Sequence, residues 1–152
     1  MGHVYEATVE WRAGKGEPFP TRNYSRAHRW KFDGGADILA SASPEIVRVP
    51  LSDPAGVDPE EALVASLASC HMLFFLDLAA RAGLDVARYT DRATGEMGTN
   101  AAGKQAMVRA VLRPEVGFAG EADPAKVAEL HHRAHELCYI ANSVNFPVEV
   151  EA

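Results

Sequence analysis

The sequence predicts an α+β fold in which antiparallel strands surround one long central helix. Segments with alternating polar and apolar residues, typical of half-buried strands, lie on both sides of this helix in the chain. The helix is apolar or small on every face from Leu63 to Leu76, apart from Cys70 and His71. One antiparallel sheet cannot surround such a helix, so we expect a homodimer in which two central helices pack together inside two sheets.

The central helix has clear start and stop signals. Asp58 is a good N-cap, and Pro59 suits the first helical position, where its missing N–H costs nothing. Glu60 and Glu61 place negative charge near the positive end of the helix dipole. Gly83 supplies a stop, which predicts a helix of about 24 residues, roughly 36 Å long.

Three strands are predicted before this helix. The two that follow the loop at 12–22 are joined as a hairpin by Gly34-Gly35. The predicted strands are His3–Trp11, Tyr24–Asp33 and Asp37–Ser43, and 46–49 is expected to be a short extended piece.

The second of these strands has one aromatic face, which we expect to point inward. Period two places Arg26 and His28 on this face with Tyr24, Trp30 and Phe32, while Arg29 points to solvent. A buried guanidinium needs a carboxylate partner because an unpaired buried charge is costly. Arg26 therefore either meets a carboxylate or reaches water at the sheet edge.

More strands and a second helix are predicted after the central helix. Asp123-Pro124 is again a cap followed by proline, so a helix is expected from Pro124 to about Leu137, with a turn or short helix over 139–143. The predicted strands are 86–98 with a turn near Thr94-Gly95, 105–114, and 146–150.

Size and charge narrow the function classes. The length of 152 residues predicts one domain over 1–152, and the net charge of -6 without a basic run argues against nucleic acid and anionic membranes as partners. The N-terminus lacks the pattern of a signal peptide, so we expect a cytoplasmic protein. Polar residues interrupt the central helix, which therefore is not interpreted as a membrane span.

The two cysteines and a group of histidines carry the candidate chemistry. In a cytosolic protein, Cys70 and Cys138 are more often catalytic, redox-active or metal-binding than structural, although a buried cysteine is often only a small core residue. His71 is interpreted as a core or interface histidine. The spacing of His131, His132, His135 and Cys138 permits a helical metal site, but no CxxC, HExxH or acidic ligand accompanies it.

Two segments resemble the OsmC/Ohr family. Asp58-Pro59-Glu60-Glu61 followed by a small-residue helix to Ser69-Cys70 is similar to the family's N-P-E-[EQ]…A-C segment. Cys138, placed after a helix and before Ala141-Asn142-Ser143, resembles the family's second cysteine. The order of elements also agrees along nearly the whole chain.

The resemblance implies an intertwined homodimer that reduces organic hydroperoxides without a cofactor or metal. It implies that Cys70 is the peroxidatic thiol, that Cys138 resolves its sulfenic acid into a disulfide, and that a dithiol, in the Ohr branch a lipoylated protein, reduces this disulfide. Glu60 takes the position of the family's Glu. Arg26 is our choice for its Arg, with Arg29 and Arg48 as runners-up.

Glu60 adds a geometric constraint, because ten residues of helix separate it from Cys70 by about 15 Å. If Glu60 serves the thiol, it must come from the partner subunit, with the two central helices antiparallel. Tyr139 stands where the family usually has Pro, and His71 where it usually has Phe, which indicates a divergent branch. Two other functions stay open, namely a binding protein for a small hydrophobic ligand at the dimer interface and a metal site.

Overall fold

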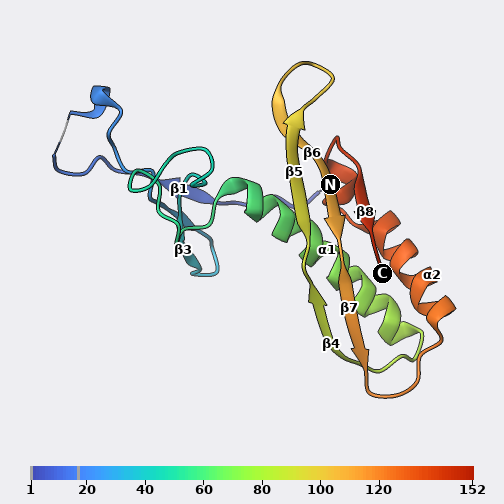
Figure 1. The fold of residues 1–152 in the computed structure, drawn as a ribbon. Helices are drawn as coiled ribbons and strands as arrows, with labels where there is room; N and C mark the ends of the chain where they lie inside the picture. The colour runs from blue at the N-terminus through green and yellow to red at the C-terminus, as the bar shows by residue number, and fades with distance from the viewer. Residues whose placement is uncertain (1, 17) are drawn as a thin grey trace. The chain divides into compact units, whose positions relative to one another are not determined.

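The structure is a computed structural model that describes residues 2–16 and 18–152, and it is α+β (Figure 1). The chain forms two compact units, Met1–Ala62 and Leu63–Ala152. The helix α1 (Pro59–Arg81) begins in the first unit and continues through the second.

The N-terminal unit is built on one antiparallel sheet in the order β1 (Thr8–Glu10), β2 (His28–Lys31), β3 (Asp37–Ala40). The predicted hairpin is confirmed, with Gly35 at φ +96° in the turn. A 3-10 turn, η1 (Phe19–Thr21), lies in the predicted loop.

The predicted face assignment of β2 is confirmed, but its predicted length is wrong. His28 and Trp30 are half-buried and Arg29 and Lys31 exposed, as the period of two requires. Residues 24–27 precede the strand without pairing, and Phe32, expected inside, is 37% exposed. The prediction of an extended piece at 46–49 is also wrong, because Ile46 and Val47 donate their backbone N–H groups to Ser43 O in a turn.

Helix α1 begins and ends as its local sequence predicts. Asp58 Oδ1 accepts from the Glu61 N–H at 2.8 Å, and Glu61 Oε1 accepts from the Asp58 N–H at 2.9 Å, which is a complete capping box. At the other end Gly83 adopts φ +79°, and Leu84 N–H donates to Ala79 O at 3.0 Å, the Schellman arrangement.

The C-terminal unit contains two small sheets. One pairs β4 (Val86–Asp91) with β7 (Pro114–Phe118), and the other has the order β5 (Thr94–Thr99), β6 (Gln105–Leu112), β8 (Val148–Val150). The helix α2 (Pro124–Leu137) has the predicted bounds, and the short helix η2 (Ala141–Ser143) follows it.

Three predictions about these strands need correction. The turn between β4 and β5 falls at residues 92–93 instead of 94–95. The strand predicted to end at Pro114 ends at Leu112, and Pro114 opens a separate strand that the sequence analysis missed, since proline is tolerated at the first position of a strand. β8 pairs with β6 in parallel, because the chain crosses over through β7 and α2 between them.

One face of α1 packs against this unit in two clusters. Phe75 and Ala79 contact Leu130 and Ala134 of α2, with apolar residues of β4 and β7 around them. Leu67 contacts the buried face of β6 and residues near β8. Only four residues of α1 are buried, namely Leu67, His71, Phe75 and Ala79, and other apolar residues of the helix are partly covered or exposed within the chain.

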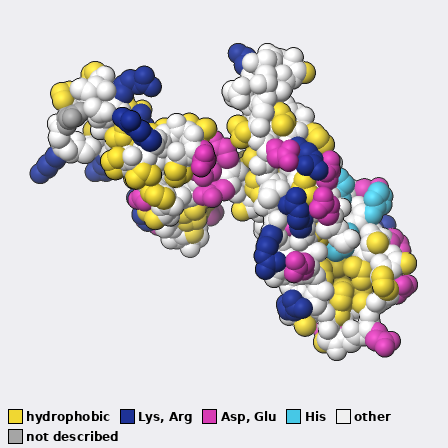
Figure 2. Space-filling model, in the orientation of Figure 1, with side chains coloured by type: hydrophobic (Ala, Val, Ile, Leu, Met, Phe, Trp, Pro, Cys, Tyr) yellow, Lys and Arg dark blue, Asp and Glu magenta, His cyan; other side chains and the backbone are white. Residues whose placement is uncertain are grey.

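By length and apolar content α1 resembles a membrane-crossing helix, a property that it shares with core helices of soluble proteins. The strands beside it carry ion pairs of both signs, including Arg109 with Glu96 and Glu149. Basic and acidic side chains accordingly alternate over this unit, without a large patch of one sign on the face in Figure 2.

Candidate functional site

The two cysteines lie together in the C-terminal unit, although they are far apart in the sequence. Cys70 is half-buried in the middle of α1, and Cys138 is the buried C-cap of α2. Both are free thiols, and the Cys70 side chain is close enough to Cys138 to contribute to its raised pKa. The fold therefore brings together two thiols, one of them partly accessible to solvent.

The electrostatics around Cys138 keep its thiol protonated. Burial raises the pKa of Cys138 to about 11; the backbone N–H of Ala141, which donates to Sγ at 3.5 Å, opposes this shift, and the interaction with Cys70 adds to it. At neutral pH Cys138 is thus a thiol whose proton is available to its neighbour. Such a group is inert until its sulfur has an electrophile to attack.

The turn after Cys138 is held by its own side chains. Asn142 Nδ2 donates to Glu136 O at 3.0 Å, and Ser143 Oγ donates to Tyr139 O at 2.7 Å. Tyr139 itself is exposed and meets the ring of Phe74 edge-on at 5.0 Å. The Ala141-Asn142-Ser143 segment therefore orients Cys138 on the end of α2.

The histidines form a buried pair and do not form a metal site. His71 Nε2 and His131 Nδ1 are 3.0 Å apart, and burial lowers the pKa of each imidazole to about 4. His132 lies on the surface against Glu136, and the buried Nδ1 of His135 has no hydrogen-bond partner among the described residues. Within 2–16 and 18–152, no three His, Cys, Asp or Glu side chains are gathered as ligands for a metal ion.

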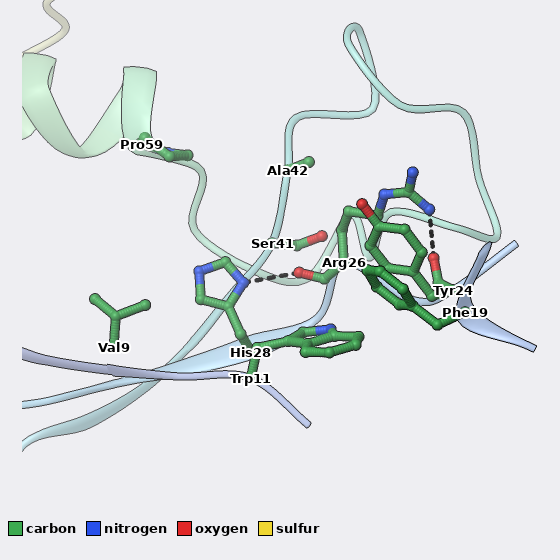
Figure 3. Close-up of a pocket in the computed structure, with 9 residues that line it drawn as sticks. All are labelled: Val9, Trp11, Phe19, Tyr24, Arg26, His28, Ser41, Ala42 and Pro59. Atoms are coloured by element: carbon green, nitrogen blue, oxygen red, sulfur yellow. Dashed lines mark hydrogen bonds between the residues drawn. The ribbon is translucent and has the colours of Figure 1, made fainter. Parts of the chain in front are cut away.

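The N-terminal unit contains an apolar cavity of about 480 Å³ (Figure 3). Three aromatic rings form part of its wall, with Phe19 stacked on Tyr24 at 4.6 Å and Trp11 tilted against both at 5.5 Å. Trp11 Nε1 donates to Ser25 O at 2.8 Å, which fixes the indole. The lining is Val9, Trp11, Phe19, Tyr24, Arg26, His28, Ser41, Ala42 and Pro59.

Arg26 lies in the wall of this cavity, as its inward parity predicts. Its guanidinium stacks over the Tyr24 ring at 3.7 Å, and Nη1 donates to the carbonyls of Tyr24 at 2.5 Å and Arg22 at 2.9 Å. His28 Nδ1 lies 2.7 Å from Arg26 O, so the backbone is held as well. No carboxylate of the described residues forms an ion pair with Arg26, contrary to the partner that we expected.

Glu60 and the two alternative arginines are placed differently. Glu60 stands in the first turn of α1, where Oε2 is buried and has no hydrogen-bond partner among the described residues. Arg29 is exposed and pairs with Asp37 at 2.9 Å, and Arg48 is exposed in a turn. Arg26 lines the aromatic cavity, whereas Arg29 lines a separate pocket together with Glu10 and Lys31.

The sequence analysis missed Trp11, Phe19 and Tyr24 as a group that lines one cavity. These aromatic residues lie before, within and after a loop rich in glycine and proline. No regular spacing relates them, so the sequence pattern did not indicate that they form one group. The pairing of His71 with His131 was missed for the same reason, since sixty residues separate them.

Comparison with known proteins gives consistent results. The family model described as OsmC-like protein matches residues 52–152. An OsmC-like protein of unknown function from Vibrio cholerae is 51% identical, with 99% of each chain covered and a TM-score of 0.96. No curated protein matches.

Two more distant structures share the fold. The OsmC-like protein from Mycoplasma pneumoniae is 17% identical over 99% of this chain and 96% of that one, with a TM-score of 0.73. An organic hydroperoxide resistance protein from Elizabethkingia anophelis is 16% identical over 99% and 95%, with a TM-score of 0.67.

Proposed function

The chain belongs to the OsmC-like family, and on that premise we propose that it is a thiol-dependent peroxidase for organic hydroperoxides. The observation that carries this proposal is the contact between the reachable Cys70 and the buried, protonated Cys138. Structures with this fold include proteins named for organic hydroperoxide resistance.

In the proposed reaction, the thiolate of Cys70 attacks one oxygen of the O–O bond. That bond breaks, an alkoxide leaves and takes a proton to become the alcohol, and Cys70 becomes a sulfenic acid. The Cys138 sulfur then attacks the Cys70 sulfur, the S–S bond forms, and the hydroxyl group leaves with the Cys138 proton as water. An external dithiol returns both cysteines to thiols by exchange.

The raised pKa of Cys138 suits a resolving role. A protonated resolving thiol does not compete for peroxide, and it supplies the proton that the departing hydroxyl group needs. The proposed reductant is a dithiol, and a lipoylated protein fits by family resemblance. A reducing compartment such as the cytoplasm would keep both thiols reduced between turnovers.

We further propose that Arg26 and Glu60 complete the site in an intertwined homodimer. Arg26 and Glu60 belong to the N-terminal unit and the thiols to the C-terminal unit. The buried Glu60 Oε2 has no hydrogen-bond partner in the part of the chain that the structure describes, and a guanidinium is the group that would satisfy it best. A guanidinium near Cys70 would favour its thiolate and hydrogen-bond the peroxide.

The uncovered face of α1 supports the dimer. Leu73 is 60% exposed in the middle of a helix that is apolar all round. Leu73→Glu should therefore convert a dimer into a monomer in sedimentation equilibrium, whereas Arg133→Glu on the exposed face of α2 should not. A monomeric parent protein would contradict the shared site.

The decisive experiment is intact mass after one equivalent of cumene hydroperoxide, with a thiol count. The parent should lose two hydrogens and both thiols, Cys138→Ser should gain one oxygen, and Cys70→Ser should not react. Arg26→Ala should slow the reaction by about a hundredfold, while Arg29→Ala, which removes an exposed arginine paired with Asp37, serves as its control. An unchanged parent mass with both thiols free would overturn the proposal.

The second candidate is a binding protein for a small hydrophobic ligand. The aromatic cavity of the N-terminal unit favours it, because its wall is almost entirely apolar. Titration with an apolar aromatic compound, followed by the fluorescence of Trp11, tests this function, and Trp30→Phe removes the other tryptophan from the signal.

A further inference from the structure

His71 of α1 and His131 of α2 form a buried hydrogen-bonded pair that the proposed chemistry does not use. His71 is 0% and His131 3% exposed, and their rings lie 2° from parallel with Nε2 and Nδ1 at 3.0 Å. Phe75 stacks on the His131 ring at 4.0 Å. The pair therefore sits inside the cluster that joins the two helices.

This pair costs stability compared with two apolar side chains. Both imidazoles are kept neutral by burial, so they share a single N–H···N bond. His71 Nδ1 is buried and has no partner among the described residues. Replacement of a buried polar pair by apolar groups of similar shape is often neutral or stabilising, so the pair calls for an explanation other than stability.

The hydrogen bond between His71 and His131 is a directional contact between α1 and α2, whereas the other contacts between the two helices are apolar. Phe75, Ala79, Leu130 and Ala134 pack through apolar surface, which has no preferred register. Among the described residues, the two imidazoles make the hydrogen bond that ties the middle of α1 to the middle of α2. A single buried polar contact of this kind is the best attested means of selecting one register.

The register of the two helices decides where the two thiols lie. Cys70 directly precedes His71 on α1, and Cys138 follows His131 by about two helical turns, on the same side of α2. A disulfide requires Cα atoms about 4.4–6.8 Å apart, whereas a slip of one turn moves a helix by about 5.4 Å. A small change in register would thus separate the thiols.

We propose that the His71–His131 hydrogen bond is a positioning element that sets the register of α1 against α2 and so holds Cys70 and Cys138 at disulfide-forming distance. The inference rests on the proposed function only in that the disulfide is a step of that cycle. If the histidine pair holds the two thiols together, each thiol has a high effective concentration toward the other. This effective concentration is a property of the folded chain and can be measured without peroxide.

The test is the thiol–disulfide equilibrium of Cys70 and Cys138 in glutathione buffers of known ratio, without peroxide. In His71→Leu/His131→Leu, the effective concentration should fall about tenfold, while the urea midpoint stays equal or rises. His131→Asn places an amide where Nδ1 stood and should retain most of the parent value. His132→Ala, on the exposed face of the same helix, is the matched control and should leave it unchanged.

An unchanged effective concentration in the folded double leucine variant would overturn the proposal. If that variant does not fold, the comparison of His131→Asn with His131→Leu decides, and equal values for these two would overturn it as well. The peroxidase proposal fails by a different result, namely no reaction of the parent with cumene hydroperoxide while its thiols still equilibrate with glutathione.

Discussion

The two units of this chain differ in how they bury their apolar residues. The C-terminal unit closes two apolar clusters around one face of α1, with Leu67, Phe75 and Ala79 fully buried. The N-terminal unit leaves Val4 and Tyr5 88% exposed and Val9 65% exposed. The C-terminal unit thus has a buried core of its own, while the N-terminal unit exposes more of its large apolar side chains.

The placement of the candidate residues follows this difference. The thiols lie where the core is closed, and the aromatic cavity with Arg26 lies where it is open. A reactive thiol pair needs fixed geometry, which a closed core provides, whereas a substrate cavity needs access. The two thiols and the aromatic cavity thus belong to different units of the chain.

The largest loss of stability is expected from a substitution in the core of the C-terminal unit. Phe75→Ala should lower the free energy of unfolding by about 4 kcal/mol, since it removes a fully buried ring between α1, α2 and the β4–β7 sheet. Trp11→Ala in the N-terminal unit should cost only about 1 kcal/mol, because its ring is 39% exposed. Urea unfolding checks both, and equal losses would contradict the comparison.

The next largest effect is a loss of stability at acidic pH, which we expect because the histidine pair of the C-terminal unit must become protonated. Burial holds the pKa of His71 and His131 at about 4, against 6.5 for an ordinary histidine, and His135 opposes the charging of His71 as well. Between pH 6.5 and pH 4, the unfolded chain binds protons at these histidines that the folded chain does not bind. The free energy of unfolding is therefore highest above pH 6.5 and falls as the pH drops toward 4.

The loss should reach up to about 3 kcal/mol for each imidazole. Urea unfolding at pH 7 and pH 4.5 measures it, and the difference between the parent and His71→Leu/His131→Leu isolates the pair from other titrating groups. His132→Ala should keep the parent's pH dependence, because His132 is exposed. The same slope in the double variant as in the parent would contradict this assignment.

A smaller effect is expected where the two units meet in the sequence, at the start of α1. Asp58→Ala removes the acceptor for the Glu61 N–H and should cost about 1 kcal/mol. Asp58→Asn keeps a capping oxygen and should lose much less. Thermal unfolding of the two variants measures the contribution of the cap, and equal stabilities would show that the cap is not needed.

The smallest change in stability is expected from a substitution on the surface of the N-terminal unit. Arg29→Ala removes an exposed ion pair with Asp37 and should change the free energy of unfolding by less than about 0.5 kcal/mol. Peroxide turnover should also stay unchanged. A large loss of turnover in Arg29→Ala but not in Arg26→Ala would reverse our choice of arginine.

The features that depend on neighbouring residues could be predicted from the amino-acid sequence. Both ends of α1 and the start of α2 follow from caps, prolines and a glycine, because these contacts form within one turn of the chain. The parity of β2 followed from its period, which placed His28 and Trp30 inward and Arg29 outward. The family also followed from local motifs around Glu60 and Cys70.

The features that join residues distant in the sequence could be seen only in the folded chain. The separate strand that begins at Pro114, the parallel pairing of β8, the hydrogen bond of His71 with His131 and the contact of Cys70 with Cys138 all depend on how helices and strands pack. A sequence pattern reports which face of an element is apolar, but not which side chain of another element that face will meet, because apolar burial is not directional.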